Sequence, residues 1–171
     1  MPEATAKSEP SAENPQRIDL PCAWYARDMD ADKSWIWRFQ PEHLEELDAA
    51  LRISKETGLA EQELTKADFP LDGFAKVLDA LLDELEFGRG VVLMRGLPVA
   101  KYSLEDLRRL YWGIGTHMGK TMSQNINGEH MQEVRDHGFD YSKPEHRGSM
   151  TAARLRPHCD ISDVVGLLCV R

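Results

Sequence analysis

The side chains in this sequence that are best suited to hold a metal ion are a histidine and an aspartate two positions apart, His158 and Asp160. They come just before the apolar segment 164–170, whose composition predicts a β-strand. In extended backbone, residues two positions apart point to the same face, so the imidazole and the carboxylate converge while Cys159 faces the other way. Such a pair supplies two of the three protein ligands of a 2-His-1-carboxylate iron site. No histidine follows His158 in the sequence, so the third ligand is not apparent.

An H-x-D triplet is short, and its context has to be weighed against chance. With six His and fourteen Asp among 171 residues, a random order would produce roughly half of one such triplet. His43 and Glu45 form a similar H-x-E pair, but they fall in a predicted helix, where residues two positions apart diverge by about 200°. The strand context therefore distinguishes His158 and Asp160. The alternative is a His and an Asp that only hydrogen-bond at a sheet edge.

Composition restricts the classes of partner. The 171 residues suffice for one domain, and 21 basic against 29 acidic residues give a net charge of -8 without a basic stripe, which argues against nucleic acid. No apolar run reaches the roughly 18 residues needed to cross a bilayer, and the first residues lack signal-peptide features, so we expect a cytoplasmic protein with no membrane partner. Three cysteines without C-x-x-C spacing predict reduced, mostly buried thiols.

Periodicity predicts a helical first part of the chain. Residues 1–17 are polar and are predicted to form a disordered tail, with order beginning near Ile18. Three amphipathic helices and two short strands are then expected. In order, these are a strand at 35–37, a helix from Pro41 to Gly58, a helix after an Asp68 cap and Pro70 up to Gly88, a strand at 90–95 buried on both faces, and a helix from a Ser103 cap to about Gly115.

The second part of the chain is predicted to be rich in loops and strands. Residues 119–148 are loop-like, with Asn127 and Gly128 marking a hairpin turn and a short strand at 131–134. Strand patterns return from about residue 150. Helices followed by strands predict an α+β fold, in which a helical layer supports a mainly antiparallel sheet. Segment 164–170 is uncharged, and an uncovered strand of this kind favours self-association, so we expect further strands to cover it.

Residues 156–171, RPHCDISDVVGLLCVR, resemble the metal-binding strand of the TauD/TfdA-like family, the taurine dioxygenase relatives among Fe(II)/2-oxoglutarate-dependent oxygenases. Residues 90–98, GVVLMRGLP, resemble the family's strand leading into the jelly roll, and residues 112–119, WGIGTHMG, resemble the end of the helix that follows. The resemblance covers about residues 20–171. It implies an incomplete double-stranded β-helix (jelly roll) with supporting N-terminal helices, in which residues 18–171 form the N-terminal part of the dioxygenase domain.

Carried over by position, the resemblance implies that His158 and Asp160 are iron ligands, that Fe(II) is the cofactor and that 2-oxoglutarate is the cosubstrate. The implied reaction uses molecular oxygen to hydroxylate a small-molecule substrate while 2-oxoglutarate is converted to succinate and carbon dioxide. The family's distal His and its 2-oxoglutarate-binding Arg lie downstream of H-x-D, and no position here matches either. We therefore expect an incomplete catalytic domain. Such a domain binds Fe(II) weakly on its own, because it supplies only two ligands.

Other polar residues are secondary candidates. Gln124 and Asn125 lie in the loop where relatives line the active-site mouth, so they are candidates to bind substrate or 2-oxoglutarate, with ordinary loop amides as the alternative. His117, at a predicted helix end, fits a partner of the helix dipole. Three histidines are candidates for a third ligand, with solvated loop residues as the alternative: His130, His137 and His146. Four arginines are candidates to attract an anionic substrate, with surface ion pairs as the alternative: Arg135, Arg147, Arg154 and Arg156.

Two other functions remain open from the sequence. One is a non-catalytic, truncated jelly-roll protein that binds a ligand or a partner through its open sheet. The other is a cupin-like metal enzyme with a different set of ligands. The identity of the substrate is not evident from these residues.

Overall fold

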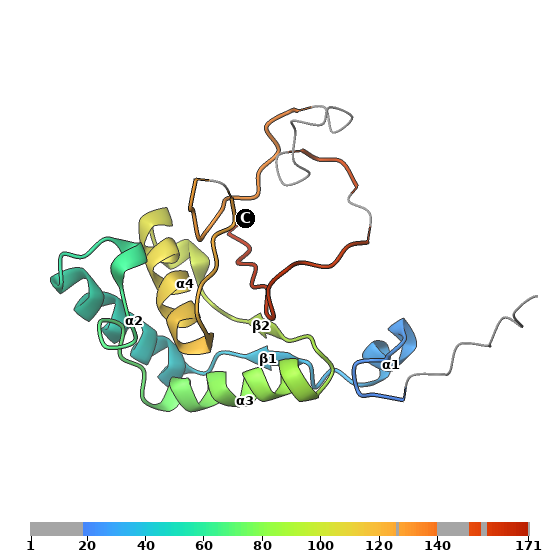
Figure 1. Cartoon of the computed structure of the whole chain (residues 1–171). Coiled ribbons are helices and arrows are strands. Elements are labelled where there is room, and N and C mark those ends of the chain that lie inside the picture. Colours follow the sequence, from blue (N-terminus) through green and yellow to red (C-terminus); the bar gives the residue numbers. More distant parts are fainter. Residues whose placement is uncertain (1–18, 126, 140–150, 155–156, 171) are drawn as a thin grey trace, which may run out of the picture.

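A computed structural model describes residues 19–125, 127–139, 151–154 and 157–170 (Figure 1). The tail predicted for residues 1–17 lies outside the described residues. The elements are α1 (Ala26–Ala31), β1 (Ile36–Arg38), α2 (Pro41–Glu56), the 3-10 helix η1 (Glu61–Glu63), α3 (Gly73–Phe87), β2 (Leu93–Arg95), the 3-10 helix η2 (Val99–Lys101) and α4 (Leu104–Met118). The predicted α+β class is confirmed, with few strands. Among the described residues, no helix has the length and apolar character to cross a bilayer.

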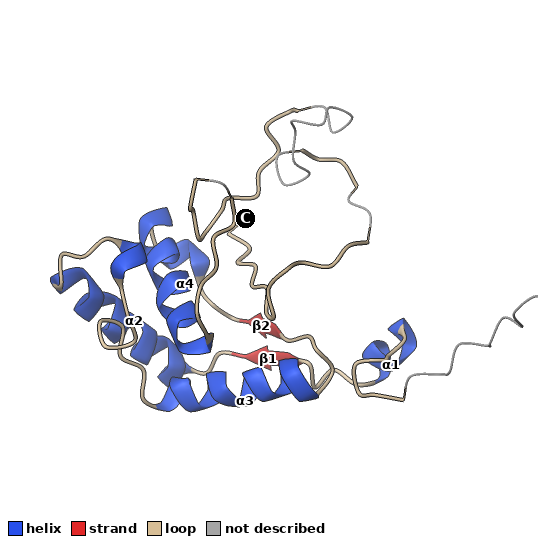
Figure 2. Cartoon of the chain, viewed as in Figure 1, coloured by secondary structure: helices blue, strands red, loops and turns tan. Residues whose placement is uncertain are grey.

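The apolar core lies between three helices and two strands. Helices α2, α3 and α4 pack on one another, and strands β1 and β2 lie beside them (Figure 2). The strands pair in parallel, with Ile36 opposite Leu93. Trp37 of β1 and Met94 of β2 pack against the core, so the strands extend the helical layer. The largest fully buried apolar side chains are Leu47, Phe69, Phe74, Leu78 and Leu110.

Helix α2 forms as its sequence predicts. Pro41 occupies the first turn, where its missing N–H is not needed. Leu47, Ala50 and Leu51 recur at helical spacing and are buried in the core. The helix ends shortly before Gly58, which has a φ of 69°, a left-handed conformation that glycine adopts without steric cost.

Helix α3 begins later than predicted and is capped differently. Asp68, the predicted cap, instead accepts hydrogen bonds from the backbone N–H and the hydroxyl of Thr65, at 2.9 and 2.6 Å. Glu46 of α2 caps α3, because its carboxylate accepts the N–H of Phe74 at 2.9 Å and the N–H of Asp72. A carboxylate at a helix N-terminus satisfies free N–H groups and interacts favourably with the helix dipole. The cap is distant in sequence, so the local pattern did not reveal it.

Helix α4 begins at its predicted cap and continues further than predicted. The backbone N–H of Asp106 donates to the Ser103 hydroxyl at 3.1 Å, as expected for an N-cap serine. The helix then continues beyond Gly115, its predicted end. No residue from 106 to 118 is exposed. Other parts of the chain therefore cover α4 on its outer side as well as on its core side.

The strands are fewer and shorter than predicted. Within residues 90–95 only β2 pairs, and it is partly exposed rather than buried on both faces. Segments 131–134, 151–154 and 157–170, where strands were predicted, contain none in the structure. The one described strand pair is parallel, not antiparallel. The physical reason is that a strand needs a neighbour to take up its backbone hydrogen bonds, and these segments have no such neighbour among the described residues.

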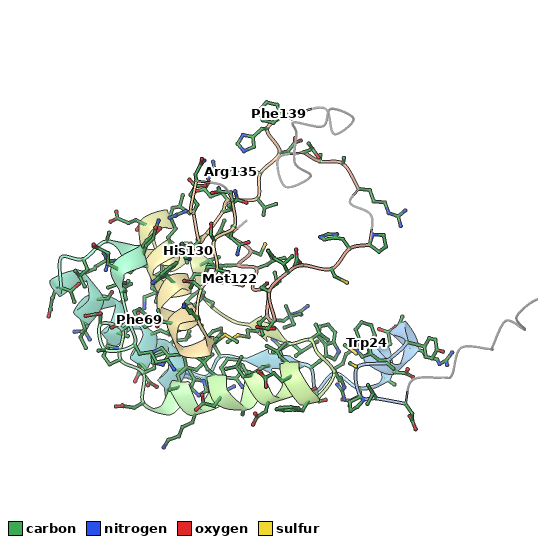
Figure 3. All side chains as sticks on the ribbon, in the orientation of Figure 1. Trp24, Phe69, Met122, His130, Arg135 and Phe139 are labelled. Atoms are coloured by element: carbon green, nitrogen blue, oxygen red, sulfur yellow. The ribbon has the colours of Figure 1, made fainter. Side chains whose placement is uncertain are left out.

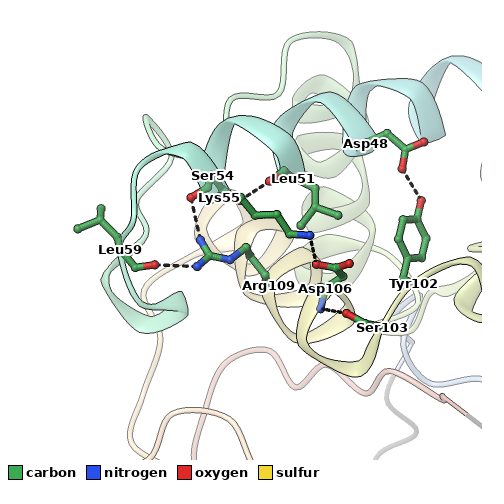
Figure 4. Close-up of polar contacts among 9 residues, drawn as sticks. All are labelled: Asp48, Leu51, Ser54, Lys55, Leu59, Tyr102, Ser103, Asp106 and Arg109. Atoms are coloured by element: carbon green, nitrogen blue, oxygen red, sulfur yellow. Dashed lines mark hydrogen bonds and ion pairs between the residues drawn. The ribbon is translucent and has the colours of Figure 1, made fainter.

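Polar contacts from α4 fix the end of α2 beside it (Figure 4). Arg109 donates to the carbonyl oxygens of Ser54 and Leu59 at 2.8 and 2.7 Å. Carbonyls in the last turn of a helix lack an intrahelical partner, so a guanidinium is well suited to bond them. Lys55, near the same end of α2, forms an ion pair with Asp106 in the first turn of α4. These contacts hold the two helices in a fixed relative position.

The hydrogen bond between Tyr102 and Asp48 is expected to depend on pH. The Tyr102 hydroxyl donates to the Asp48 carboxylate at 2.9 Å (Figure 4). Burial, followed by this hydrogen bond, raises the pKa of Tyr102 to about 12. Because the folded-state pKa is raised, the stabilisation is fully present below the ordinary pKa of 10.0 and is lost as pH rises through about 12. We expect Tyr102→Phe to lower the free energy of unfolding by about 1 kcal/mol at neutral pH.

Urea unfolding of wild type and Tyr102→Phe at increasing pH measures this difference. The difference should close between pH 10.0 and about 12. The matched control is Tyr25→Phe at an exposed tyrosine, which should change the free energy of unfolding by less than about 0.5 kcal/mol. A difference between wild type and Tyr102→Phe that stays constant across this range would contradict the role given to the Asp48 contact.

Candidate metal centre

The side chains of His158 and Asp160 converge, as their spacing predicts. The distance from His158 Nε2 to Asp160 Oδ1 is 4.0 Å, and both side chains are more than half exposed, by 58% and 57%. Their backbone is not part of a paired strand, so the strand context used for the prediction is wrong. The convergence itself arises from local backbone shape. The role of the two residues as metal ligands stays a prediction.

The donor types and positions can be compared with what Fe(II) requires. An imidazole nitrogen and a carboxylate oxygen are both suitable ligands. With bonds of about 2.0–2.2 Å, two ligand atoms in adjacent coordination positions lie about 3 Å apart. The observed 4.0 Å would have to shorten by about 1 Å, which exposed side chains can achieve by rotation. Among the described residues no group of three His, Cys, Asp or Glu side chains is arranged to hold a metal. The pair therefore fits two positions of a three-ligand site.

The segment that follows Asp160 bends at residues 161–163 and then continues without regular secondary structure. The partly buried side chains are Ser162, Val164 and Leu168, and the exposed ones include Ile161 at 91%, Val165 at 54% and Leu167 at 84%. Gly166 interrupts the apolar run, and its neighbour is Tyr111 of α4. A glycine inside a strand pattern indicates close approach of another group, a signal that the sequence predictions did not use. The segment thus meets the protein at a few side chains, while several of its apolar side chains are exposed.

Gln124 and Asn125 lie in a tight turn whose groups bond to one another. The Gln124 N–H donates to the Glu129 carbonyl at 2.6 Å, and the Gln124 side chain donates to the Met122 carbonyl at 3.2 Å. The Asn125 side-chain oxygen accepts the N–H groups of Asn127 and Glu129 at 3.0 and 3.2 Å. This geometry is that of loop amides bonded to local backbone. Binding of 2-oxoglutarate or substrate by Gln124 and Asn125 stays a prediction.

The predicted hairpin turn is confirmed as a turn. The Gly128 N–H donates to the Asn125 carbonyl at 3.1 Å, and Gly128 has a φ of 78°. A positive φ at this position is one that glycine adopts without strain. Because 131–134 is not a strand, the turn joins loop segments rather than the strands of a hairpin.

Two of the other histidines have structural partners. His117 is buried in the last turn of α4, and its Nε2 lies 2.8 Å from the Phe69 carbonyl oxygen. Figure 3 labels His130, whose Nδ1 lies 3.1 Å from the Thr121 hydroxyl. The ring of His130 meets the ring of Trp112 edge-on. Both side chains are therefore used in packing the loop and the helix rather than directed toward His158.

The loop after α4 is held to the helix by charge. Arg108 of α4 lies 3.7 Å from the Glu133 carboxylate, and Arg135 lies 2.9 Å from the same carboxylate (Figure 3). Arg135 thus forms the surface ion pair that was the alternative to anion attraction. His137 stacks on Phe139. His146, Arg147 and Arg156 lie outside the described residues, and Arg154 is exposed.

The three cysteines are exposed and form no disulfide with one another, which corrects the prediction that they are mostly buried. Cys22 lies before α1, outside the helical core. Cys159 and Cys169 lie on the C-terminal segment, several of whose side chains are exposed. A buried thiol needs neighbours on every side, and the two exposed thiols of this segment do not have them.

The comparison with known families defines the class of the protein. Residues 50–171 match the family described as Taurine catabolism dioxygenase TauD, TfdA family. The match covers most of the chain, and the chain belongs to this family. This is the family that the resemblance predicted. The predicted metal ligands both lie within the matched region.

A particular relative is FR-33289 synthase of Streptomyces rubellomurinus. The chain is 28% identical to it over 149 residues, which cover 86% of this chain and 44% of the synthase. The chain thus spans less than half the length of that curated relative. At this identity and coverage, the likeness supports a shared family and does not extend to the activity or the substrate of the whole protein.

Proposed function

We propose that this chain is the N-terminal part of an Fe(II)/2-oxoglutarate-dependent dioxygenase that uses molecular oxygen to hydroxylate a small-molecule substrate. The observation that carries the proposal is the convergence of His158 and Asp160, 4.0 Å apart, within the region that matches the dioxygenase family. For the complete catalytic domain we propose a double-stranded β-helix, with helices α2, α3 and α4 as its supporting layer.

Each ligand has a defined role in this proposal. His158 binds the metal through a neutral ring nitrogen, and Asp160 binds it through an ionised carboxylate, so both must be deprotonated. The bound metal supplies the place where 2-oxoglutarate and oxygen are brought together with substrate. A third ligand and a cation for the 2-oxoglutarate carboxylate come from residues other than the described ones. Gln124 and Asn125 would contact 2-oxoglutarate only after giving up bonds within their own turn.

Anaerobic calorimetric titration of the full chain with Fe(II) tests the role of His158. We expect His158→Ala to lower the affinity for Fe(II) by at least about 10-fold, the lower end of the loss seen when a residue that only supports a ligand is removed. The matched control is His137→Ala, because His137 is an exposed loop histidine that stacks on Phe139. Its affinity should equal that of wild type. Equal Fe(II) affinity in the two variants would overturn the assignment.

A second candidate is a non-catalytic protein that uses its C-terminal segment to bind a partner. The observation that favours it is the exposure of the apolar side chains Ile161, Val165 and Leu167 in that segment. Exposed apolar side chains that lie together are typical of interaction sites. If the protein has this function, it should show no Fe(II) binding that depends on His158. It should also self-associate, which light scattering detects. A monomer that binds Fe(II) through His158 would exclude it.

A further inference from the structure

The outer side of α4 carries a tyrosine that contacts the C-terminal segment. Tyr111 belongs to the part of α4 in which no residue is exposed. Burial raises the pKa of the Tyr111 phenol above its ordinary value of 10.0. The fully buried Leu110, one position earlier, faces the core cluster. Tyr111 is therefore turned away from the core and is covered by another part of the chain.

The part of the chain that covers Tyr111 includes Gly166. A Cβ atom placed on Gly166 would lie 2.6 Å from the Tyr111 hydroxyl oxygen, 3.5 Å from its Cζ and 3.7 Å from its Cε2. Carbon atoms do not approach an oxygen that closely without a shift of one of them. Gly166 does not have a positive φ, so its backbone is open to any residue. Only the space beside Tyr111 requires glycine at this position.

We infer that Tyr111 is a positioning residue for the predicted metal ligands, and that Gly166 is where their segment docks onto α4. The inference rests on the proposed function of His158 and Asp160. Gly166 lies six positions after Asp160, with a bend at 161–163 between them, so holding Gly166 against α4 limits how far the ligand pair can move. No strand pairing among the described residues holds this segment, and the approach of Gly166 to Tyr111 is one contact that joins it to α4.

The contact at Gly166 also restricts the position of the segment on α4. The side chains next to Gly166 are those of Val165 and Leu167, and both are exposed. A shift of the segment by one residue would bring a valine or a leucine against Tyr111, where even a methyl group lacks room. The glycine therefore limits how the segment can shift along α4.

A double-mutant experiment tests this inference in the full chain. Co(II) serves as an oxygen-stable probe of the metal site, and its absorption spectrum reports ligand geometry. We expect Gly166→Ala to weaken Co(II) binding by about 10- to 100-fold, as loss of a group that supports metal ligands does. Tyr111→Phe removes the hydroxyl that the new methyl group would meet, which leaves Cζ at 3.5 Å as the nearest atom. The double variant Gly166→Ala/Tyr111→Phe should therefore regain the affinity and spectrum of wild type.

Hydrogen exchange of the metal-free chain gives an independent measurement. Gly166→Ala should increase exchange in segment 157–170 and leave the amides of α2 and α3 unchanged, and Tyr111→Phe should reverse the increase. The matched control is Gly115→Ala, because Gly115 is in α4 with nothing within 4 Å of its Cβ position. This variant should behave as wild type in both measurements.

Two results would overturn the inference. In the first, Gly166→Ala matches wild type in Co(II) affinity and in hydrogen exchange. In the second, the double variant binds Co(II) as weakly and exchanges as fast as Gly166→Ala alone. A wild-type chain without His158-dependent Co(II) binding would instead overturn the proposed function. In that event the exchange measurement still decides whether Tyr111 holds the segment in place.

Discussion

Asp160→Ala is expected to abolish Fe(II)-dependent formation of succinate by the complete catalytic domain while leaving the helical core folded. The carboxylate is one of only two candidate ligands that the described part of the chain brings together, at 4.0 Å from His158. Removing a ligand should reduce turnover by more than about 100-fold, the upper end of the loss caused by changing a group that merely supports a ligand. The Asp160 side chain is more than half exposed, so its removal leaves no cavity in the core.

Succinate release from 2-oxoglutarate, measured with saturating Fe(II), tests this expectation. The matched control is Asp163→Ala, which removes an exposed carboxylate from the same segment. Asp163→Ala should retain turnover close to that of wild type, and circular dichroism should be the same for all three proteins. Unchanged turnover in Asp160→Ala would rule out Asp160 as a ligand.

Phe69→Ala is expected to produce the largest loss of stability among single changes in the core. The Phe69 side chain is fully buried at 0% exposure, and its ring lies so close to Gly113 of α4 that a Cβ atom at Gly113 would overlap it. Removal of such a ring leaves a cavity and costs about 3–5 kcal/mol. A domain of this size is stable by only about 5–15 kcal/mol, so a large part of the folded population would be lost on mild heating.

Urea unfolding of Phe69→Ala and Phe87→Ala compares the same substitution in two environments. Phe87 lies at the end of α3 and is 74% exposed, so its truncation should change the free energy of unfolding by less than about 0.5 kcal/mol. If both variants lose the same stability, the core does not lie where α4 meets the segment before α3.

The helices were predictable because their signals are local. Apolar residues at three- and four-residue spacing placed α2 and α3 in the core, and Ser103 marked the start of α4. The start of α3 was missed because its cap, Glu46, is provided by another helix. A cap that depends on tertiary packing has no signature in the residues beside it.

The strands and the metal site were predictable only in part. Apolar residues after Asp160 predict a strand, but residues 161–163 form a bend and residues 164–170 have no regular secondary structure. Whether extended backbone becomes a strand depends on a partner, which the residues themselves do not specify. The convergence of His158 and Asp160 could be predicted from their spacing. A third ligand would lie far from these two residues in the sequence, so no local pattern identifies it.

The parallel pairing of β1 and β2 has a consequence for how the protein reaches this structure. Helices α2 and α3 lie between the two strands in the chain, so the ends of a long loop must meet before Ile36 can pair with Leu93. Closing a long loop loses chain entropy before the contacts at its ends lower the free energy. Folding therefore slows as the share of such non-local contacts increases. We therefore expect the helices to assemble first and the small sheet to join them late, near the end of the folding pathway.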